Sequence, residues 1–302
     1  SYKKDEQIKK INVNNAPLSA QVRIVKEDYD TGKAVTLNSA SFKIKDEDGN
    51  YVVQKVGGVK IDTFTTNSKN QVVSIFGKQG EVVLPLKLQS GSYTIDEIKT
   101  PEGFLELEKP VTFKIENIRD MDQDEDQEPI ITVKVKNRLP KGILTIKKVD
   151  QTTKLPMENV EYCLTAKKDI INMIDGSKLY KAGETVYEGK TNAKGIITIK
   201  DINMGEYELR EKLTLEGYVL SEEVHDVVFT KKDNTTKVYE IGVNVTNIAP
   251  KGEIHLVKKD KDTKEFLSGV IYQLTAKEDI VSLDGRNTVL YKAGEPVSVD
   301  IS

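Results

Sequence analysis

The amino-acid sequence predicts an all-β protein built from tandem antiparallel β-sandwiches, and three observations support this fold class. Short runs rich in Val, Ile, Thr and Tyr alternate apolar and polar residues with a period of two, which is typical of half-buried strands. Turn-forming residues separate these runs, for example at Asp48-Gly49-Asn50 and Ser90-Gly91-Ser92. Matching segments recur along the chain, so one structural unit is present more than once.

The repeats are clearest where one unit ends and the next begins. The sequence VKNRLPKG at residues 135–142 recurs as VTNIAPKG at residues 245–252, and a weaker copy, NVNNAP, lies at residues 12–17. An alternating strand that ends in Lys and then Asp follows each copy. These three predicted strands cover residues 22–28, 144–150 and 254–260.

The repeats divide the 302-residue chain into four parts. Residues 1–17 are expected to be the last strand of an upstream repeat, residues 18–140 and 141–250 two complete domains, and residues 251–302 the first half of a third repeat. The linkers between repeats are short and contain Pro-Lys-Gly, so they predict an extended array of domains with limited flexibility between neighbours.

Strand periodicity also predicts which polar side chains point into each core, because residues two apart in a strand share a face. The residues two and four positions before Lys26 and Lys148 are apolar. Both lysines are therefore expected to face the core, whereas the neighbouring Lys147 is expected to face away from it.

The same rule places an acid and an amide in each core: Glu97 and Glu211 on a third strand, and Asn137 and Asn247 on the closing strand. Buried Lys and Glu are rare unless paired, because desolvating a charge is costly. Burial lowers the pKa of a lysine and raises that of a glutamic acid. A neutral amine could then attack the Asn carboxamide while the acid carries protons to the departing ammonia.

These residues resemble those of the collagen-adhesin B-type domains (SpaA-like, prealbumin-like) of Gram-positive surface adhesins and pilins. The resemblance rests on Lys-x-Asp in the first strand, Tyr-x-x-x-Glu before a Gly-aromatic pair, and Asn in the last strand, and it covers essentially the whole chain. It implies Ig-like, prealbumin-like sandwiches that join a Lys to an Asn spontaneously. The implied groups are Lys26, Asn137 and Glu97 in the first domain, Lys148, Asn247 and Glu211 in the second, and Lys258 and Asn14 in incomplete repeats that cannot close within this sequence.

The function that the resemblance implies is a structural stalk or shaft of a cell wall-anchored adhesin or pilin, outside the cell of a Gram-positive bacterium and without enzymatic turnover. Its partners would be adjacent domains of the same protein, with host extracellular matrix or glycan contacted through other domains. Two alternatives remain open. The repeats could bind a host matrix protein or glycan directly, or they could form an accessory module of a secreted enzyme.

Composition argues against several other classes of protein. The net charge of −3, with both signs interspersed, gives no basis for binding nucleic acid or an anionic membrane. The single cysteine, Cys163, excludes an intrachain disulfide, and no apolar run approaches the ~20 residues of a membrane span. The acidic run at residues 120–128 lacks the central Gly of an EF-hand loop, and the two histidines lie far apart, so neither a metal nor a cofactor is expected.

Overall fold

The computed structural model describes residues 18–73, 77–116, 122–123, 129–282 and 288–301. This part of the chain is built from strands and turns, which confirms the predicted all-β fold class. It forms two compact units, one containing the chain up to Leu139 and the other most of the chain from Pro140 onward. Within the ranges described, no helix is long and apolar enough to cross a membrane.

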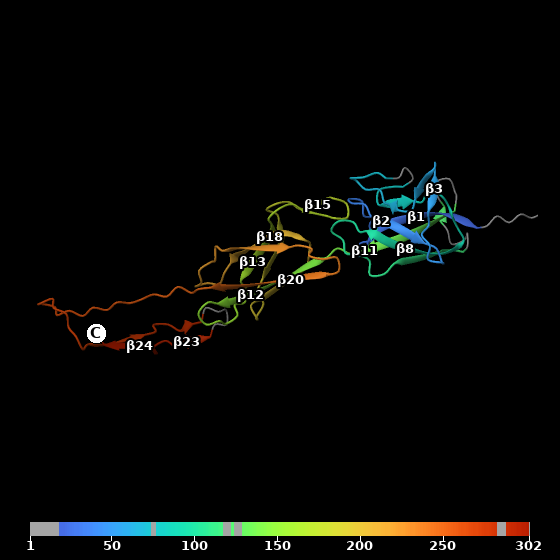
Figure 1. Ribbon diagram of the computed structural model, residues 1–302. Helices are drawn as coiled ribbons and strands as arrows, with labels where there is room; N and C mark the ends of the chain where they lie inside the picture. Colours follow the sequence, from blue (N-terminus) through green and yellow to red (C-terminus); the bar gives the residue numbers. More distant parts are fainter. Residues whose placement is uncertain (1–17, 74–76, 117–121, 124–128, 283–287, 302) are drawn as a thin grey trace, which may run out of the picture. The chain divides into compact units, whose positions relative to one another are not determined.

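The first sandwich pairs two sheets from the first unit (Figure 1). One sheet has the order β10-β11-β1-β6, with β7 also paired to β1, and the other has the order β5-β2-β8-β9; a hairpin, β3-β4, follows β2. The strands are β1 (Ser19–Asp28), β2 (Ser41–Lys45), β3 (Gln54–Val56), β4 (Val59–Ile61), β5 (Phe64–Thr65), β6 (Glu81–Val83), β7 (Leu88–Gln89), β8 (Gly91–Lys99), β9 (Val111–Ile115), β10 (Asp122–Gln123) and β11 (Pro129–Asn137).

The second sandwich repeats this plan in the second unit. Its sheets have the orders β17-β12-β20 and β16-β13-β18-β19, and a short hairpin, β14-β15, extends from it. The strands are β12 (Lys141–Asp150), β13 (Glu161–Ala166), β14 (Ile170–Ile171), β15 (Lys178–Tyr180), β16 (Thr185–Lys190), β17 (Ile196–Ile202), β18 (Gly205–Leu213), β19 (Val224–Phe229) and β20 (Val238–Asn247).

The remaining strands lie within residues 251–302, which the sequence predicts to be part of a third repeat: β21 (Ile271–Thr275), β22 (Ile280–Val281), β23 (Val289–Tyr291) and β24 (Pro296–Ile301). They form two separate two-stranded sheets, β21-β24 and β22-β23. The strand predicted at residues 254–260 is wrong, because this segment makes only an isolated bridge between Lys259 and Phe266. The equivalent β12 pairs on both sides, with β17 and β20, whereas no strand among the described residues pairs with residues 254–260.

The first and last strands of each sandwich lie side by side and run parallel. Strand β1 pairs with β11, and β12 pairs with β20, while the other strand pairs described in the two sandwiches are antiparallel. In Figure 1 the green β12 therefore neighbours the orange β20. Parallel pairing needs a long connection between the two strands, and here the rest of the domain supplies it.

The register of these parallel pairs is the same in both sandwiches. Lys26 lies opposite Val135 with Asn137 two residues further on, and Lys148 lies opposite Val245 with Asn247 two residues further on. Because side chains two apart share a face, each Lys and Asn point to the same side of their sheet. That side is the core, since every second residue from Gly142 to Asp150 is buried along β12.

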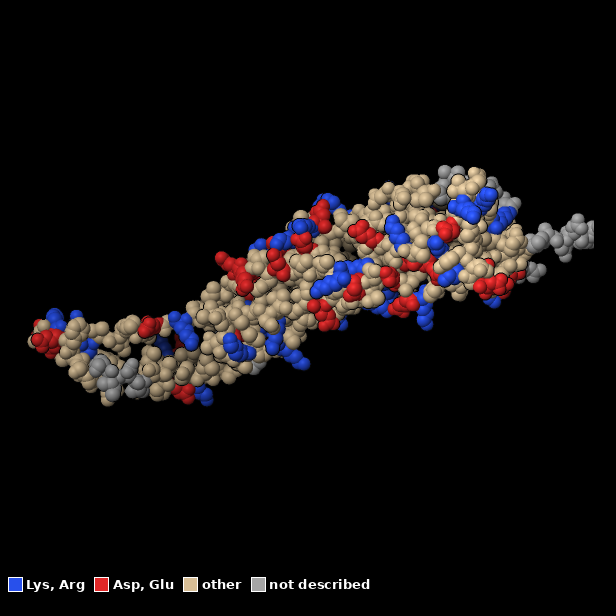
Figure 2. All heavy atoms as spheres, viewed as in Figure 1, with Lys and Arg blue, Asp and Glu red and all other residues tan. Residues whose placement is uncertain are grey.

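Each core fills with apolar side chains from both sheets, which fixes the faces that the two sheets present to each other. In the second sandwich, for example, Leu144, Ile146 and Ile197 pack with Tyr162 and Leu209 of the facing sheet. Outside the cores, the face shown in Figure 2 mixes Lys and Arg with Asp and Glu, consistent with the interspersed charges of the sequence.

Candidate cross-linking sites

The second sandwich brings a buried amine, a carboxyl group and a carboxamide into contact. The side chain of Lys148 is 0% exposed and that of Glu211 is 1% exposed. The Lys148 Nζ donates to Glu211 Oε2 at 2.9 Å and also hydrogen-bonds to Asn247 Oδ1. The nucleophilic nitrogen therefore lies against the amide group that it would have to attack.

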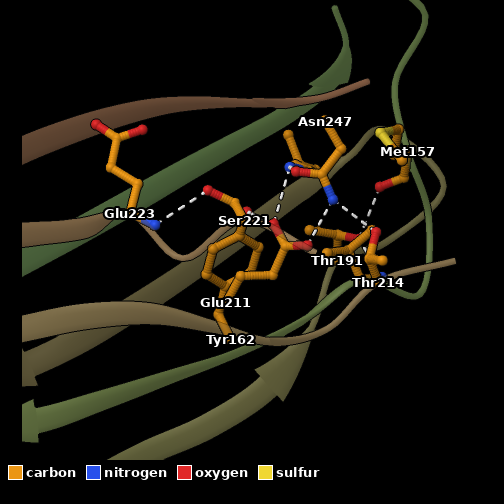
Figure 3. A network of polar contacts seen from close by, with 10 residues as sticks. Met157, Tyr162, Thr191, Glu211, Thr214, Ser221, Glu223 and Asn247 are labelled. Atoms are coloured by element: carbon orange, nitrogen blue, oxygen red, sulfur yellow. Dashed lines mark hydrogen bonds and ion pairs between the residues drawn. The ribbon is translucent and has the colours of Figure 1, made fainter. Parts of the chain in front are cut away.

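The carboxyl group of Glu211 bridges the other two groups, one with each oxygen. While Oε2 accepts from Lys148, Oε1 accepts a hydrogen bond from Asn247 Nδ2. The same Nδ2 donates to Thr214 Oγ1 at 2.6 Å, which fixes the plane of the carboxamide (Figure 3). One acid thus contacts both the attacking nitrogen and the nitrogen that would leave.

The surroundings favour the neutral amine. Burial lowers the pKa of Lys148 below its ordinary value, although the neighbouring Glu211 opposes this shift. Tyr162 borders the site, with the centre of its ring 6.0 Å from Lys148 Nζ, and its hydroxyl donates to Glu211 Oε2 at 2.9 Å. Burial and the adjacent carboxyl raise the pKa of Tyr162, so the phenol remains a protonated hydrogen-bond donor.

The equivalent lysine of the first sandwich, Lys26, is also buried in the core. Lys26 is fully buried, and its Nζ lies 5.3 Å from the centre of the Phe104 ring and donates to the backbone oxygen of Glu27 at 3.2 Å. Burial lowers the pKa of Lys26 to about 8, against the opposing effects of Glu97, Asp28 and Glu27. A sizeable fraction of this amine is therefore neutral near physiological pH.

The acid and amide of the first sandwich are also in contact. Asn137 Nδ2 donates to Glu97 Oε2 at 2.6 Å and to the backbone oxygen of Leu105 at 2.8 Å. Burial raises the pKa of Glu97, and hydrogen bonds from Asn137 and Thr100 oppose the shift. Glu97 Oε1 and Asn137 Oδ1 are buried without a hydrogen-bond partner among the described residues. The corresponding amide oxygen of the second sandwich, Asn247 Oδ1, receives the lysine Nζ.

The Asp of the Lys-x-Asp motif has a structural role at the end of the first strand. Asp150 Oδ1 accepts from the backbone nitrogens of Thr152 and Thr153, and Oδ2 accepts from the Tyr218 hydroxyl at 2.7 Å. Asp260 accepts the equivalent pair of backbone hydrogen bonds in the predicted third repeat. This side chain therefore builds the turn that ends the strand and lies outside the reacting group.

The structure thus brings Lys148, Glu211 and Asn247 of the second sandwich into mutual contact. In the first sandwich Glu97 and Asn137 are in contact, while the buried Lys26 donates to a backbone oxygen. Lys258 is exposed and lies outside any strand, and Asn14 lies outside the described residues. Sequence reasoning missed Thr100, Thr214 and the role of Tyr162. The two threonines could have been found, because each follows the acid of its domain by three residues.

The fold and site define a class of domain: a prealbumin-like β-sandwich with a buried Lys on its first strand, a buried Asn on its last strand and an acid on the facing sheet. The family model described as "SpaA: Prealbumin-like fold domain" matches residues 20–128 and 142–242. The chain belongs to this family and contains two of its domains in tandem.

Comparison with solved structures agrees with this fold. The Bacillus anthracis TIE protein is similar with a TM-score of 0.56 and 17% identity over 94% of this chain, which spans 41% of the length of that chain. A streptococcal ancillary pilin is 18% identical with a TM-score of 0.29, over 77% of this chain and 63% of that one. The minor pilin GBS52 of Streptococcus agalactiae is 16% identical with a TM-score of 0.30, over 79% of this chain and 100% of that one. Both TM-scores are too low to support an inference. No curated protein matches the chain significantly.

Proposed function

We propose that this chain is a load-bearing stalk segment of a Gram-positive cell-surface adhesin or pilin, in which each complete sandwich closes itself with one Lys–Asn isopeptide bond. The bonds join Lys26 to Asn137 and Lys148 to Asn247. The observation that carries the proposal is the contact of Lys148 Nζ with both Glu211 and Asn247 inside a core that excludes water.

The proposed reaction needs only groups present in the site. The neutral Nζ of Lys148 attacks Cγ of Asn247, the Nζ–Cγ bond forms, the Cγ–Nδ2 bond breaks, and one ammonia leaves. Glu211 takes a proton from Nζ through Oε2 and returns a proton to Nδ2 from Oε1, the oxygen that faces it. Holding amine and amide in contact supplies the effective concentration that an uncatalysed condensation lacks.

The position of the bond suits a protein that carries tension. Lys148 lies near the end of the first strand, and Asn247 is the last residue of the neighbouring parallel strand. Force that enters along β12 would pass through the isopeptide to the end of β20 and bypass the rest of the sandwich. We therefore place the chain on the extracellular, cell wall-anchored surface, with the adjacent domains of the same protein as its main partners and without enzymatic turnover.

Intact-mass measurement of the purified chain tests the proposal. Two closed bonds make the protein lighter than its sequence by two ammonia molecules, and Lys148→Ala should restore one of them. Lys147→Ala is the matched control, because this neighbouring lysine is exposed on the same strand. A mass equal to that of the unmodified sequence would disprove the cross-links. Tandem mass spectrometry of the linked peptides would assign each bond to its residues.

A further inference from the structure

We propose that Tyr162 is a positioning residue for cross-linking in the second sandwich: its hydroxyl holds the Glu211 carboxyl with one oxygen toward Lys148 and the other toward Asn247. This inference rests on the proposed isopeptide chemistry. It adds a residue outside the Lys, acid and Asn trio, and it predicts that the two sandwiches of one chain close at different rates.

The geometry gives Tyr162 this role. Its hydroxyl donates to Glu211 Oε2 (Figure 3). The same oxygen accepts from Lys148 Nζ, so the carboxyl cannot rotate without losing both bonds. Tyr162 lies directly across from Glu211 in the pairing of β13 with β18, and it is 1% exposed. Its ring is locked by core packing, so the hydroxyl is a fixed support for the carboxyl.

The first sandwich lacks this support. Phe42 occupies the position across from Glu97 in the pairing of β2 with β8, and it has no hydroxyl to donate. Thr100 donates instead to Glu97 Oε2, the oxygen that also accepts from Asn137, which leaves Oε1 without a partner among the described residues. The carboxyl of the first sandwich is thus held on its amide side only.

A carboxyl held on the lysine side should accelerate the proton transfer that frees the amine. A hydrogen bond to an ionised group contributes enough free energy to change a rate by on the order of tenfold. Removing the Tyr162 hydroxyl would leave the carboxyl free to turn away from Lys148, because one of the two hydrogen bonds to Oε2 would be lost.

The test follows closure as it happens, with the full 302-residue chain made by cell-free translation. Samples are quenched in denaturant, and peptide mass spectrometry reports the linked fraction of each sandwich. Tyr162→Phe should slow closure of the second sandwich about tenfold, while closure of the first sandwich of the same molecules is unchanged. Tyr207→Phe is the matched control, since this buried hydroxyl donates to the backbone oxygen of Asn203, outside the trio.

One further measurement and two possible results separate a positioning role from the alternatives. Thermal unfolding of Lys148→Ala with and without Tyr162→Phe measures the stability effect of the hydroxyl where no bond can form, so slowing that merely follows lost stability would overturn the inference. An unchanged closure rate in Tyr162→Phe would also overturn it, while leaving the cross-links themselves established. Absence of any linked peptide in the unmutated chain would instead refute the proposed function.

Discussion

Replacing Glu211 with glutamine isolates the contribution of the acid and of the bond that it is proposed to promote. Gln keeps the size of the side chain but cannot exchange protons between Lys148 and Asn247. We therefore expect the second sandwich of Glu211→Gln to fold without its isopeptide bond. The first sandwich, whose acid is Glu97, should close as before and serves as a control within the same molecule.

The expected loss of stability follows from the size of the loop that the bond closes. Lys148 and Asn247 are 99 residues apart. In the chain-entropy model a cross-link that closes a loop of about 100 residues contributes about 4.7 kcal/mol at 25 °C. Since 1 kcal/mol corresponds to about 4–8 °C in a domain of this size, the Tm of the second sandwich should fall by roughly 20 °C or more.

Differential scanning calorimetry, together with intact mass, measures both parts of this prediction. Glu208→Gln is the matched control, because Glu208 lies on the same strand with a side chain 27% exposed and pairs with Arg210 on the surface. The reasoning would be refuted if Glu211→Gln still lost the ammonia of the second bond. It would also be refuted if the bond were absent and the Tm fell by less than about 5 °C.

Four further predictions concern residues of the two sandwiches. Because burial lowers the pKa of Lys26 to about 8, closure of the first sandwich during cell-free translation should accelerate as pH rises toward about 8 and level off above it. Gly195→Ala should lower the unfolding free energy by about 2–4 kcal/mol, since its φ is +71° and a Cβ would lie 2.2 Å from the backbone oxygen of Lys148. Gly183→Ala, with a φ of +82° and nothing within 4 Å, should cost only about 1–2 kcal/mol in the same chemical denaturation experiment. Asp150→Ala should remove the strand-ending turn and cost about 1–3 kcal/mol, measured in the same way.

Much of the candidate site could be predicted from the sequence because a strand alternates its faces strictly. The apolar residues before Lys148 determine that it points inward, and the same pattern leaves Lys147 exposed. The closing strands place Asn137 and Asn247 inward by the same rule, and both are buried. The two-residue alternation is therefore sufficient to predict that the lysine and the asparagine of each sandwich point into the same core.

Other features depend on pairing across strands, which alternation does not encode. The role of Tyr162 arises because β13 lies beside β18 with Tyr162 opposite Glu211, and a single sequence gives no register between them. The wrong prediction of a strand at residues 254–260 has the same origin. Their alternation matches that of β12, but a strand also needs a neighbour to take its backbone hydrogen bonds.

The two sandwiches differ in how the unlinked site satisfies its polar atoms, and this difference bears on why a bond would form. In the first sandwich Glu97 Oε1 and Asn137 Oδ1 are buried without hydrogen bonds among the described residues, at a cost of about 1–3 kcal/mol for each such group. The buried Lys26 adds the cost of desolvating an amine. Condensation would replace the amine and the primary amide with one neutral secondary amide, whose N–H could donate to the carboxyl. If the proposed bond forms, relief of these buried unpaired groups would favour the linked product over the separate Lys and Asn.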